Sequence, residues 1–284
     1  MNRPGPGPAG TDTRGGPSNL QLRLITAAAG LPIVVAVVYA GGWPLAITAA
    51  AVALLASAEF THGWLFSSMP IRVVAPQVLS FGGSAVMVAG THGDERFIGA
   101  GLILAALFAL FGYAPTNALD PRRPYRVQAW CLVYIGLPLS TLVLLRDSDS
   151  GREWLSLAIL STFAVDSSAY AVGRLVGRRP MAPRISPRKT WEGAVGGFAG
   201  GVAAVLTLNA LFDTGESALT LFPFAILCPI AAQAGDLIES WMKRRMRVKD
   251  ASGLLPGHGG FLDRLDSILF VVPLLYIFLR VRVL

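Results

Sequence analysis

The residues best suited to chemistry lie near the C-terminus, in a polar run between residues 235 and 266. Four of them recur at i, i+3, i+4 and i+7, a spacing that places them on one face of a helix: Asp236, Glu239, Ser240 and Lys243. A Gly-rich turn follows, and after it Asp263 and Asp266 share one helix face because they are three residues apart. Asp236, Asp263 and Asp266 all lie at the edges of apolar segments. Three such carboxylates suit Mg²⁺, and the cations beside them suit a polyphosphate. The run therefore predicts metal-assisted phosphoryl or nucleotidyl transfer, with a purely structural charge network as the alternative.

A second cluster lies upstream, where Asp166 stands inside an apolar stretch. An ionised Asp at the centre of a membrane helix costs about 2.5–3.5 kcal/mol on insertion scales, so this carboxylate should face a partner or a wet cavity. Tyr170 and Gly173 follow at i+4 and i+7 and share its helix face. The alternative interpretation is a hydrogen bond that only holds two helices together.

A third cluster spans residues 186–193 and reads Ser-Pro-Arg-Lys-Thr-Trp-Glu-Gly. Pro187 disfavours helix at the preceding residue, and the Ser, Arg, Lys and Thr side chains offer donors that suit phosphate oxygens. The chain has only three lysines, at 189, 243 and 249, and all three lie in the two late polar regions. The Lys ammonium is a compact charge unlike the flat Arg fork, so this placement indicates that these regions need Lys chemistry. The alternative is a basic loop that lies on anionic lipid headgroups.

The composition predicts an all-α, polytopic integral membrane protein. Hydrophobic residues make up 53% of the 284, and charged residues only 14%, against about 25% in soluble domains. A soluble domain of this length could not bury so much apolar surface, whereas a bilayer accommodates it.

Nine apolar stretches approach the roughly 20 residues that span a bilayer. They cover residues 24–41, 43–60, 73–90, 97–114, 127–145, 154–173, 193–212, 218–240 and 261–279. Residues 1–22 are rich in Gly and Pro, which predicts a disordered cytoplasmic tail. We expect residues 23–150 to form the N-terminal and middle transmembrane helices, and 151–284 the catalytic transmembrane region with two basic cytoplasmic loops.

The distribution of Lys and Arg predicts that the N-terminus faces the cytoplasm and the C-terminus faces outward. With the N-terminus inside, 18 of the 24 basic residues fall in inside segments and five in outside segments, as the positive-inside rule requires. Two arginines near the C-terminus, Arg280 and Arg282, are a minor conflict with this orientation.

The late polar run resembles the signature of the phosphatidate cytidylyltransferases, also called CDP-diglyceride synthetases. The 27 residues from Ser240 to Asp266 match the family pattern throughout: Ser240, Met242, Lys243-Arg244, Lys249-Asp250, Ser252, Leu255-Pro256, His258-Gly259-Gly260, Phe261, Asp263-Arg264 and Asp266. The two upstream clusters and Gly235-Asp236-Leu237 also look like family motifs. The resemblance is strong over 160–270, and before that Glu59-Phe60 is the one local feature that matches.

The resemblance implies the reaction CTP + phosphatidate → CDP-diacylglycerol + pyrophosphate, a divalent metal, usually Mg²⁺, and a homodimer in the cytoplasmic membrane of a bacterium. The implied partners are CTP, phosphatidate and membrane lipid, with no nucleic acid. The implied catalytic residues are Asp236, Lys243, Lys249, His258, Asp263, Arg264 and Asp266. The implied metal ligands are Asp236 and Asp263, followed by Asp266 and Asp166 as second choices. The residues expected to bind substrate are Asp166, Tyr170, Ser186, Arg188, Lys189, Thr190, Glu192, Ser240, Arg244, Gly259 and Gly260.

In the implied mechanism a phosphate oxygen of phosphatidate attacks the α-phosphorus of CTP. This oxygen needs no strong base, because the second pKa of a phosphate monoester is about 6. The obstacle is the mutual repulsion of two multiply charged phosphates, which metal and Lys or Arg must neutralise. Two roles are open for His258: a hydrogen-bond or proton donor to the leaving group, or a residue of the turn.

Two other functions fit parts of the pattern. A CTP-dependent lipid-alcohol kinase of the polyprenol or phytol type shares the membrane setting and the nucleotide, but releases CDP instead of pyrophosphate. A transporter for an anionic solute would use Asp166 and Asp236 as intramembrane ion sites, but the internal repeats common in transporters are not found. A CDP-alcohol phosphatidyltransferase is disfavoured, because the Asp-Gly-x-x-Ala-Arg run expected before its late aspartates does not precede Asp263.

Overall fold

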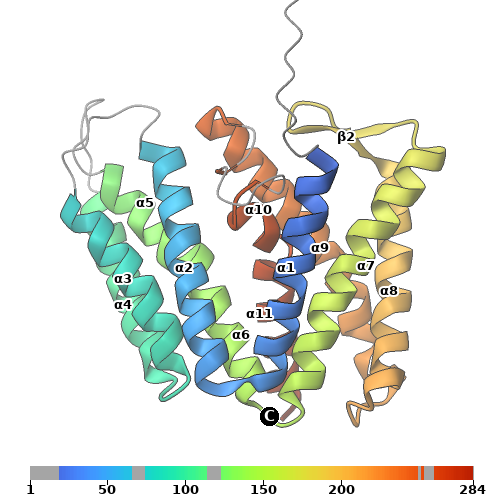
Figure 1. The fold of residues 1–284 in the computed structure, drawn as a ribbon, viewed down its shortest axis with the longest axis horizontal. Coiled ribbons are helices and arrows are strands. Elements are labelled where there is room, and N and C mark those ends of the chain that lie inside the picture. Colours follow the sequence, from blue (N-terminus) through green and yellow to red (C-terminus); the bar gives the residue numbers. More distant parts are fainter. Residues whose placement is uncertain (1–18, 66–73, 114–122, 249–250, 253–258, 284) are drawn as a thin grey trace, which may run out of the picture.

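The computed structural model describes residues 19–65, 74–113, 123–248, 251–252 and 259–283. Long helices stand side by side along one common direction, and the hairpin β1–β2 covers one end of the bundle (Figure 1). The start of α1 lies at the same end as the hairpin, and the C-terminus lies at the opposite end (Figure 1). This placement agrees with the prediction that the N-terminus and the C-terminus lie on opposite sides of the membrane. Which end of the bundle faces the cytoplasm stays a prediction.

The described part of the first half of the bundle consists of helices and short turns. It consists of α1 (Asn19–Ala40), α2 (Gly42–Leu65), α3 (Val74–Thr91), α4 (Arg96–Tyr113), α5 (Arg123–Cys131), the π-helix η1 (Leu132–Gly136) and α6 (Leu137–Asp147). The stretch 127–145, expected as one helix, is therefore interrupted by a π-helical turn. Such wide turns re-aim the side chains they carry and are frequent at functional sites.

The second half adds a small sheet that the sequence did not predict. It consists of α7 (Gly151–Val176), β1 (Pro180–Ala182), β2 (Ser186–Thr190), α8 (Trp191–Phe212), α9 (Ala218–Met246), α10 (Leu262–Leu265) and α11 (Ile268–Val283). The strands pair antiparallel, with Pro180 opposite Thr190 and Ala182 opposite Ser186. The expected loop after residue 173 is thus partly an extension of α7 and partly this hairpin.

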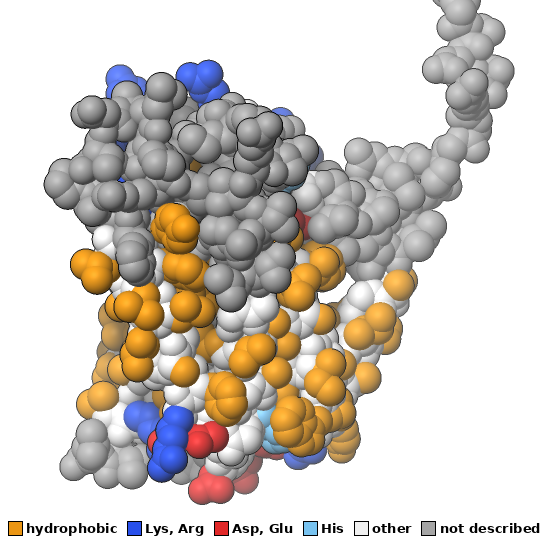
Figure 2. All heavy atoms as spheres, turned by 90° about the vertical axis from the view of Figure 1, so that its left-hand side faces the viewer, with side chains coloured by type: hydrophobic (Ala, Val, Ile, Leu, Met, Phe, Trp, Pro, Cys, Tyr) orange, Lys and Arg blue, Asp and Glu red, His pale blue; other side chains and the backbone are white. Residues whose placement is uncertain are grey.

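Five helices are long and apolar enough to cross a membrane: Gly42–Trp64, Tyr125–Asp147, Gly151–Val176, Trp191–Phe212 and Ala218–Met246. Shorter apolar helices cover Ala28–Ala40, Arg96–Leu110 and Ile268–Val281. Figure 2 shows hydrophobic side chains over the middle of one face and charged side chains gathered toward its ends. The all-α membrane architecture is confirmed, whereas the count of nine spans stays a prediction.

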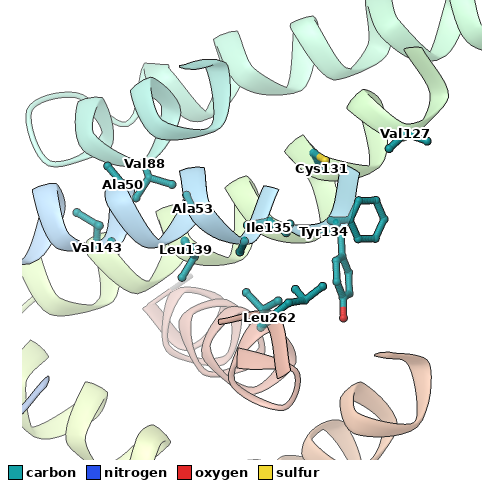
Figure 3. Packing of buried hydrophobic residues seen from close by; sticks show 14 of the residues in the cluster. Ala50, Ala53, Val88, Val127, Cys131, Tyr134, Ile135, Leu139, Val143 and Leu262 are labelled. Atoms are coloured by element: carbon teal, nitrogen blue, oxygen red, sulfur yellow. The ribbon is translucent and has the colours of Figure 1, made fainter. Parts of the chain in front are cut away.

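The described residues form three apolar cores, a small one between α4, α5 and η1 and two larger ones that both include residues of α9. One of the larger cores is formed mainly by α2, α5, η1 and α6, and it also includes Met242 of α9 and Leu262 of α10. Figure 3 shows Leu262 on the same side of this core as Tyr134 of η1, whose hydroxyl points away from its own helix. The other core joins α7, α8, α9 and α11 around Phe224 and Val205. Because α9 contributes to both cores, its polar end is fixed relative to both halves of the chain.

A tight turn at Gly41 and Gly42 joins α1 to α2. Gly41 and Gly42 both have positive φ, +62° and +52°, in the region that glycine adopts without penalty. The guanidinium of Arg146 lies against Gly41 and donates hydrogen bonds to the carbonyls of Val38 (2.8 Å) and Tyr39 (2.9 Å). These carbonyls belong to the last turn of α1, where helix oxygens lack helical partners. The arginine therefore completes the end of α1.

We expect Gly41→Ala to destabilise the protein more than Gly42→Ala. Both substitutions place a side chain at positive φ, which costs about 1–2 kcal/mol, but only the new Cβ at Gly41 would lie 2.6 Å from Arg146 Cζ. Displacing the guanidinium should cost a further ~1.5–3 kcal/mol. Thermal unfolding of the detergent-purified variants measures the difference. Repeating the comparison with Arg146→Ala in both backgrounds should abolish it, and an unchanged difference there would refute the role of the arginine.

Candidate active site

The hairpin and the polar end of α9 are joined by an ion pair that links two of the predicted clusters. Lys189 Nζ of β2 lies 2.5 Å from Asp236 Oδ2 of α9, and both side chains are partly exposed. Ser240, one turn further along α9, donates from its hydroxyl to Asp236 Oδ1 at 3.4 Å. Arg244 Nε then donates to the carbonyl of Ile185 at 3.1 Å, in the turn of the hairpin. The hairpin is therefore held over the last turns of α9.

Thr190 and Glu192 shape the hairpin and the start of α8. The Thr190 hydroxyl accepts a hydrogen bond from Gly193 N at 3.1 Å and so caps α8. A Glu192 oxygen accepts from the backbone amides of Arg178 (3.1 Å) and Arg179 (3.2 Å). Both residues were predicted to bind substrate. The structure gives each of them a positioning role, and leaves their contact with a substrate a prediction.

Lys243 forms the centre of a second charged group. Its Nζ donates to Asp263 Oδ1 at 2.6 Å and lies 3.2 Å from Glu239 Oε2. Asp263 Oδ2 accepts backbone hydrogen bonds from Gly260 N (2.8 Å) and Ala251 N (2.9 Å). The side chains are only 15%, 8% and 1% exposed for Lys243, Asp263 and Glu239 respectively. This group is thus a buried network with its donors aimed at carboxylates.

The environment of Asp263 favours its charged form. Asp263 lies in α10, outside the five long apolar helices. Burial works to raise the pKa of its carboxyl group, but hydrogen bonds from Lys243, Gly260 and Ala251 outweigh burial and hold the pKa below its ordinary value. Asp263 is therefore stabilised as an anion, with Lys243 at one oxygen and two backbone amides at the other.

Asp266 and Asp166 connect the two charged groups. Asp266 accepts a hydrogen bond from Ser267 N at 2.7 Å, and burial together with the nearby Asp236 raises the pKa of its carboxyl group. Asp166 of α7 interacts electrostatically with Asp266 and Asp236, and with two cations, Lys189 and Arg264. The three clusters that the sequence singled out therefore converge at one end of the bundle.

Other predicted site residues lie at the edge of this arrangement or outside it. Tyr170 is 67% exposed, and its hydroxyl accepts from Arg174 at 3.0 Å. Arg188 is exposed on β2, beside the partly buried Ser186. Gly259 has a φ of +83°, which suits the sharp turn expected there. Lys249 and His258 lie outside the described residues, so their predicted roles stay predictions.

The donor set fits Mg²⁺ in chemistry but is not a preformed cage. Among the residues that the structure describes, no group of three His, Cys, Asp or Glu side chains is arranged to hold a metal ion. The interactions above nevertheless bring together five carboxylates and three cations, which leaves the site rich in hard oxygen donors. The carboxylates are Asp166, Asp236, Glu239, Asp263 and Asp266. Mg²⁺ is often held by one or two carboxylates plus substrate phosphates, so the chemistry of these side chains is compatible with the metal, and metal binding stays a prediction.

Two residues of the site environment were missed by sequence reasoning. Glu59 of α2 accepts hydrogen bonds from the backbone amides of Phe261 and Leu262. In the sequence, Glu59 stood out only because Glu59-Phe60 resembles the family. Tyr134 of η1 is 8% exposed, interacts electrostatically with Glu239, Asp266 and Asp236, and has a hydroxyl without a hydrogen-bond partner among the described residues. The π-helical turn that directs this phenol leaves no recognisable mark in the sequence.

Comparison with known proteins identifies the family. A family model described as "Cytidylyltransferase family" matches residues 21–282. A phosphatidate cytidylyltransferase of Staphylococcus aureus (strain COL) is 31% identical over 265 residues, which cover 92% of this chain and 99% of the relative. A phosphatidate cytidylyltransferase of Brucella abortus biovar 1 (strain 9-941) is 34% identical over 262 residues, covering 92% of this chain and 93% of the relative. The chain, with its converging acidic and basic clusters at the end of an apolar bundle, belongs to the cytidylyltransferase family.

Proposed function

We propose that the protein transfers the cytidylyl group of CTP to phosphatidate and releases pyrophosphate. The observation that carries this proposal is the pairing of Lys189 with Asp236, which unites a basic hairpin with an acidic helix end at one end of an apolar bundle. The family match over residues 21–282 and the names of the relatives support the same substrates.

The reaction forms one bond and breaks one. A phosphate oxygen of phosphatidate bonds to the α-phosphorus of CTP, and the bond from that phosphorus to the bridging oxygen of the β-phosphate breaks as pyrophosphate leaves. The attacking oxygen is already an anion near neutral pH, so the protein needs no strong base. The ammonium groups of Lys189 and Lys243 reduce the repulsion between the two reactants, and Asp236 and Asp263 hold these ammonium groups in place.

We further propose that Mg²⁺ assists the reaction, with Asp236 and Asp263 as its protein ligands and Asp266 as a further candidate. When bound, the metal would neutralise phosphate charge and align the reactants for in-line attack. Asp236 is the more accessible of the two principal candidates, since its side chain is 31% exposed against 8% for Asp263. Asp236 is therefore the first carboxylate that a metal–nucleotide complex arriving from water would meet.

The position of the site suits one water-soluble and one lipid substrate. CTP would approach from the aqueous end of the bundle that the hairpin covers, and phosphatidate would present its headgroup from the leaflet at the depth of the helix ends. We propose that this end faces the cytoplasm of a bacterial cell, with nine spans, N-terminus in and C-terminus out, and that the protein acts as a homodimer.

The direct test is to incubate the purified protein in detergent with CTP, Mg²⁺ and phosphatidate. We expect CDP-diacylglycerol and pyrophosphate in equal amounts, and no product when phosphatidate is omitted. Release of CDP together with phosphorylation of an added polyprenol would instead identify a lipid-alcohol kinase. Absence of any CTP-dependent product, together with uptake of an anionic solute into proteoliposomes, would favour a transporter.

The metal proposal predicts that Asp236→Asn and Asp263→Asn each abolish turnover while the protein still folds in the membrane. Each change removes a charged hard oxygen that Mg²⁺ prefers. Turnover is measured across a Mg²⁺ titration, beside Asp213→Asn as a matched control. Asp213 ends α8 with a positive φ that Asn also tolerates. Near-normal activity of either site variant at limiting Mg²⁺ would remove that residue from the ligand set.

The lysine proposal predicts that Lys189→Arg loses activity although the net charge is unchanged. A broad guanidinium cannot occupy the place of an ammonium that lies 2.5 Å from Asp236. Loss of one charge-assisted contact is worth about 1.5–3 kcal/mol, or roughly ten- to 150-fold in rate if it acts at the transition state.

Steady-state kinetics of Lys189→Arg beside Lys189→Ala decide this point. Arg184→Ala serves as the control, because Arg184 is an exposed residue in the turn of the same hairpin and its loss also removes one positive charge. If Lys189→Arg matches the wild type while Lys189→Ala is inactive, Lys189 is a generic cation and the argument from lysine placement is wrong.

A further inference from the structure

Glu59 is a buried acid in the half of the chain that does not contain the polar run. It lies near the end of α2 and is only 4% exposed. Its Oε1 accepts hydrogen bonds from Ser252 Oγ (2.6 Å) and Phe261 N (3.0 Å), and its Oε2 accepts from Leu262 N (2.9 Å). The sequence separations are 193, 202 and 203 residues. This carboxylate is therefore a long-range anchor for the segment that leads into α10.

The chemistry of these contacts requires a carboxylate. All three partners donate, and an ionised carboxyl group accepts at both oxygens without offering a donor in return. Gly260 adds a steric condition, because a Cβ at this position would lie 2.6 Å from Glu59 Oε2. The backbone of the segment thus lies directly against the Glu59 side chain, and Gly260 makes this close approach possible because it has no side chain.

The anchored segment also holds the candidate catalytic carboxylate. Gly260 N donates to Asp263 Oδ2, and Asp263 Oδ1 receives Lys243 Nζ. Leu262 packs in the core formed by α2, α5, η1 and α6 (Figure 3). Residues 260–263 are therefore clamped between Glu59 on one side and Lys243 on the other. A shift of the segment would move Asp263 relative to Asp236, which α9 holds separately.

We infer that Glu59 is a positioning residue that sets the place of Asp263 for the transfer reaction. Glu59 acts through the backbone of Phe261 and Leu262 and does not itself touch the reactants. This inference rests on the proposed function for its kinetic consequence, but its structural consequence can be measured independently of activity.

The test compares Glu59→Gln with the wild type in the full-length, detergent-purified protein. Gln keeps the size of the side chain but turns one oxygen into a donor, so at least one of the three partners loses its acceptor. Hydrogen exchange of peptides that cover residues 259–266 should show faster exchange at the amides of Phe261 and Leu262, by roughly tenfold or more. In the CTP and phosphatidate assay, kcat should fall by about tenfold or more while KM for CTP changes little.

Thr61→Val is the matched control. Thr61 is two residues further along α2, is 1% exposed, and contacts Cys131 Sγ at 3.5 Å instead of the segment before α10. The substitution removes a buried polar contact from the same helix, and should change neither the exchange at Phe261 and Leu262 nor kcat.

Unchanged exchange at these two amides in Glu59→Gln would overturn the inference, whatever the activity. Faster exchange with wild-type kinetics would also overturn it, because the anchor would then have no effect on the reaction. An equal loss of kcat in Thr61→Val would reduce Glu59 to a general packing role. If the wild-type protein makes no CDP-diacylglycerol, the proposed function is refuted. The exchange measurement would still test whether Glu59 holds the segment that leads into α10.

Discussion

Carboxylates placed at the end of an apolar helix bundle must be compensated, and the arrangement of the polar end follows from this requirement. Burial of a charge without a partner costs several kcal/mol, and removal of one member of a buried pair typically costs about 3–5 kcal/mol. Lys189 meets Asp236, Lys243 together with two backbone amides meets Asp263, and three donors meet Glu59. Each of these contacts draws a different element toward α9 or α2. The folded hairpin and the short α10 are the structural result.

The apolar cores fix the positions of the elements that carry these contacts. The core around α2, α5, η1 and α6 includes Leu262, so the same segment that Glu59 anchors by hydrogen bonds is also held by packing. The core around α7 and α8 includes Phe224 of α9. Both cores therefore pack against α9, while its last turns carry a polar stripe formed by Asp236, Glu239, Ser240 and Lys243. Side chains on a helix held in this way keep their mutual positions far better than side chains on a free loop.

Much of this site follows from the sequence, because its strongest signals are local. The spacing of Asp236 and Lys243 predicts a shared helix face, and their shared face is part of α9 in the structure. The contact between Lys189 and Asp236 joins clusters 47 positions apart, and the sequence did not predict it. Glu59 could not be placed from the sequence, because its partners are mostly backbone amides, which every residue offers. Tyr134 could not be predicted for another reason. A π-helical turn changes the direction of a side chain, and no distinctive residue pattern marks such a turn in the sequence.

The polar stripe also explains why the site combines one helix with several short segments. Asp236 and Lys243 are seven residues apart, which corresponds to about 10.5 Å along the helix axis. Lys189 reaches the first of these positions from the hairpin, and Asp263 reaches the second from α10. The helix therefore sets the distance between the two charged groups, and each neighbouring segment has only to deliver one side chain to a fixed point. In the proposed reaction two separately bound phosphate compounds must meet with their reacting atoms aligned, and small errors in that alignment are costly. A rigid helix between the two charged groups limits such errors, because α9 fixes the distance between them.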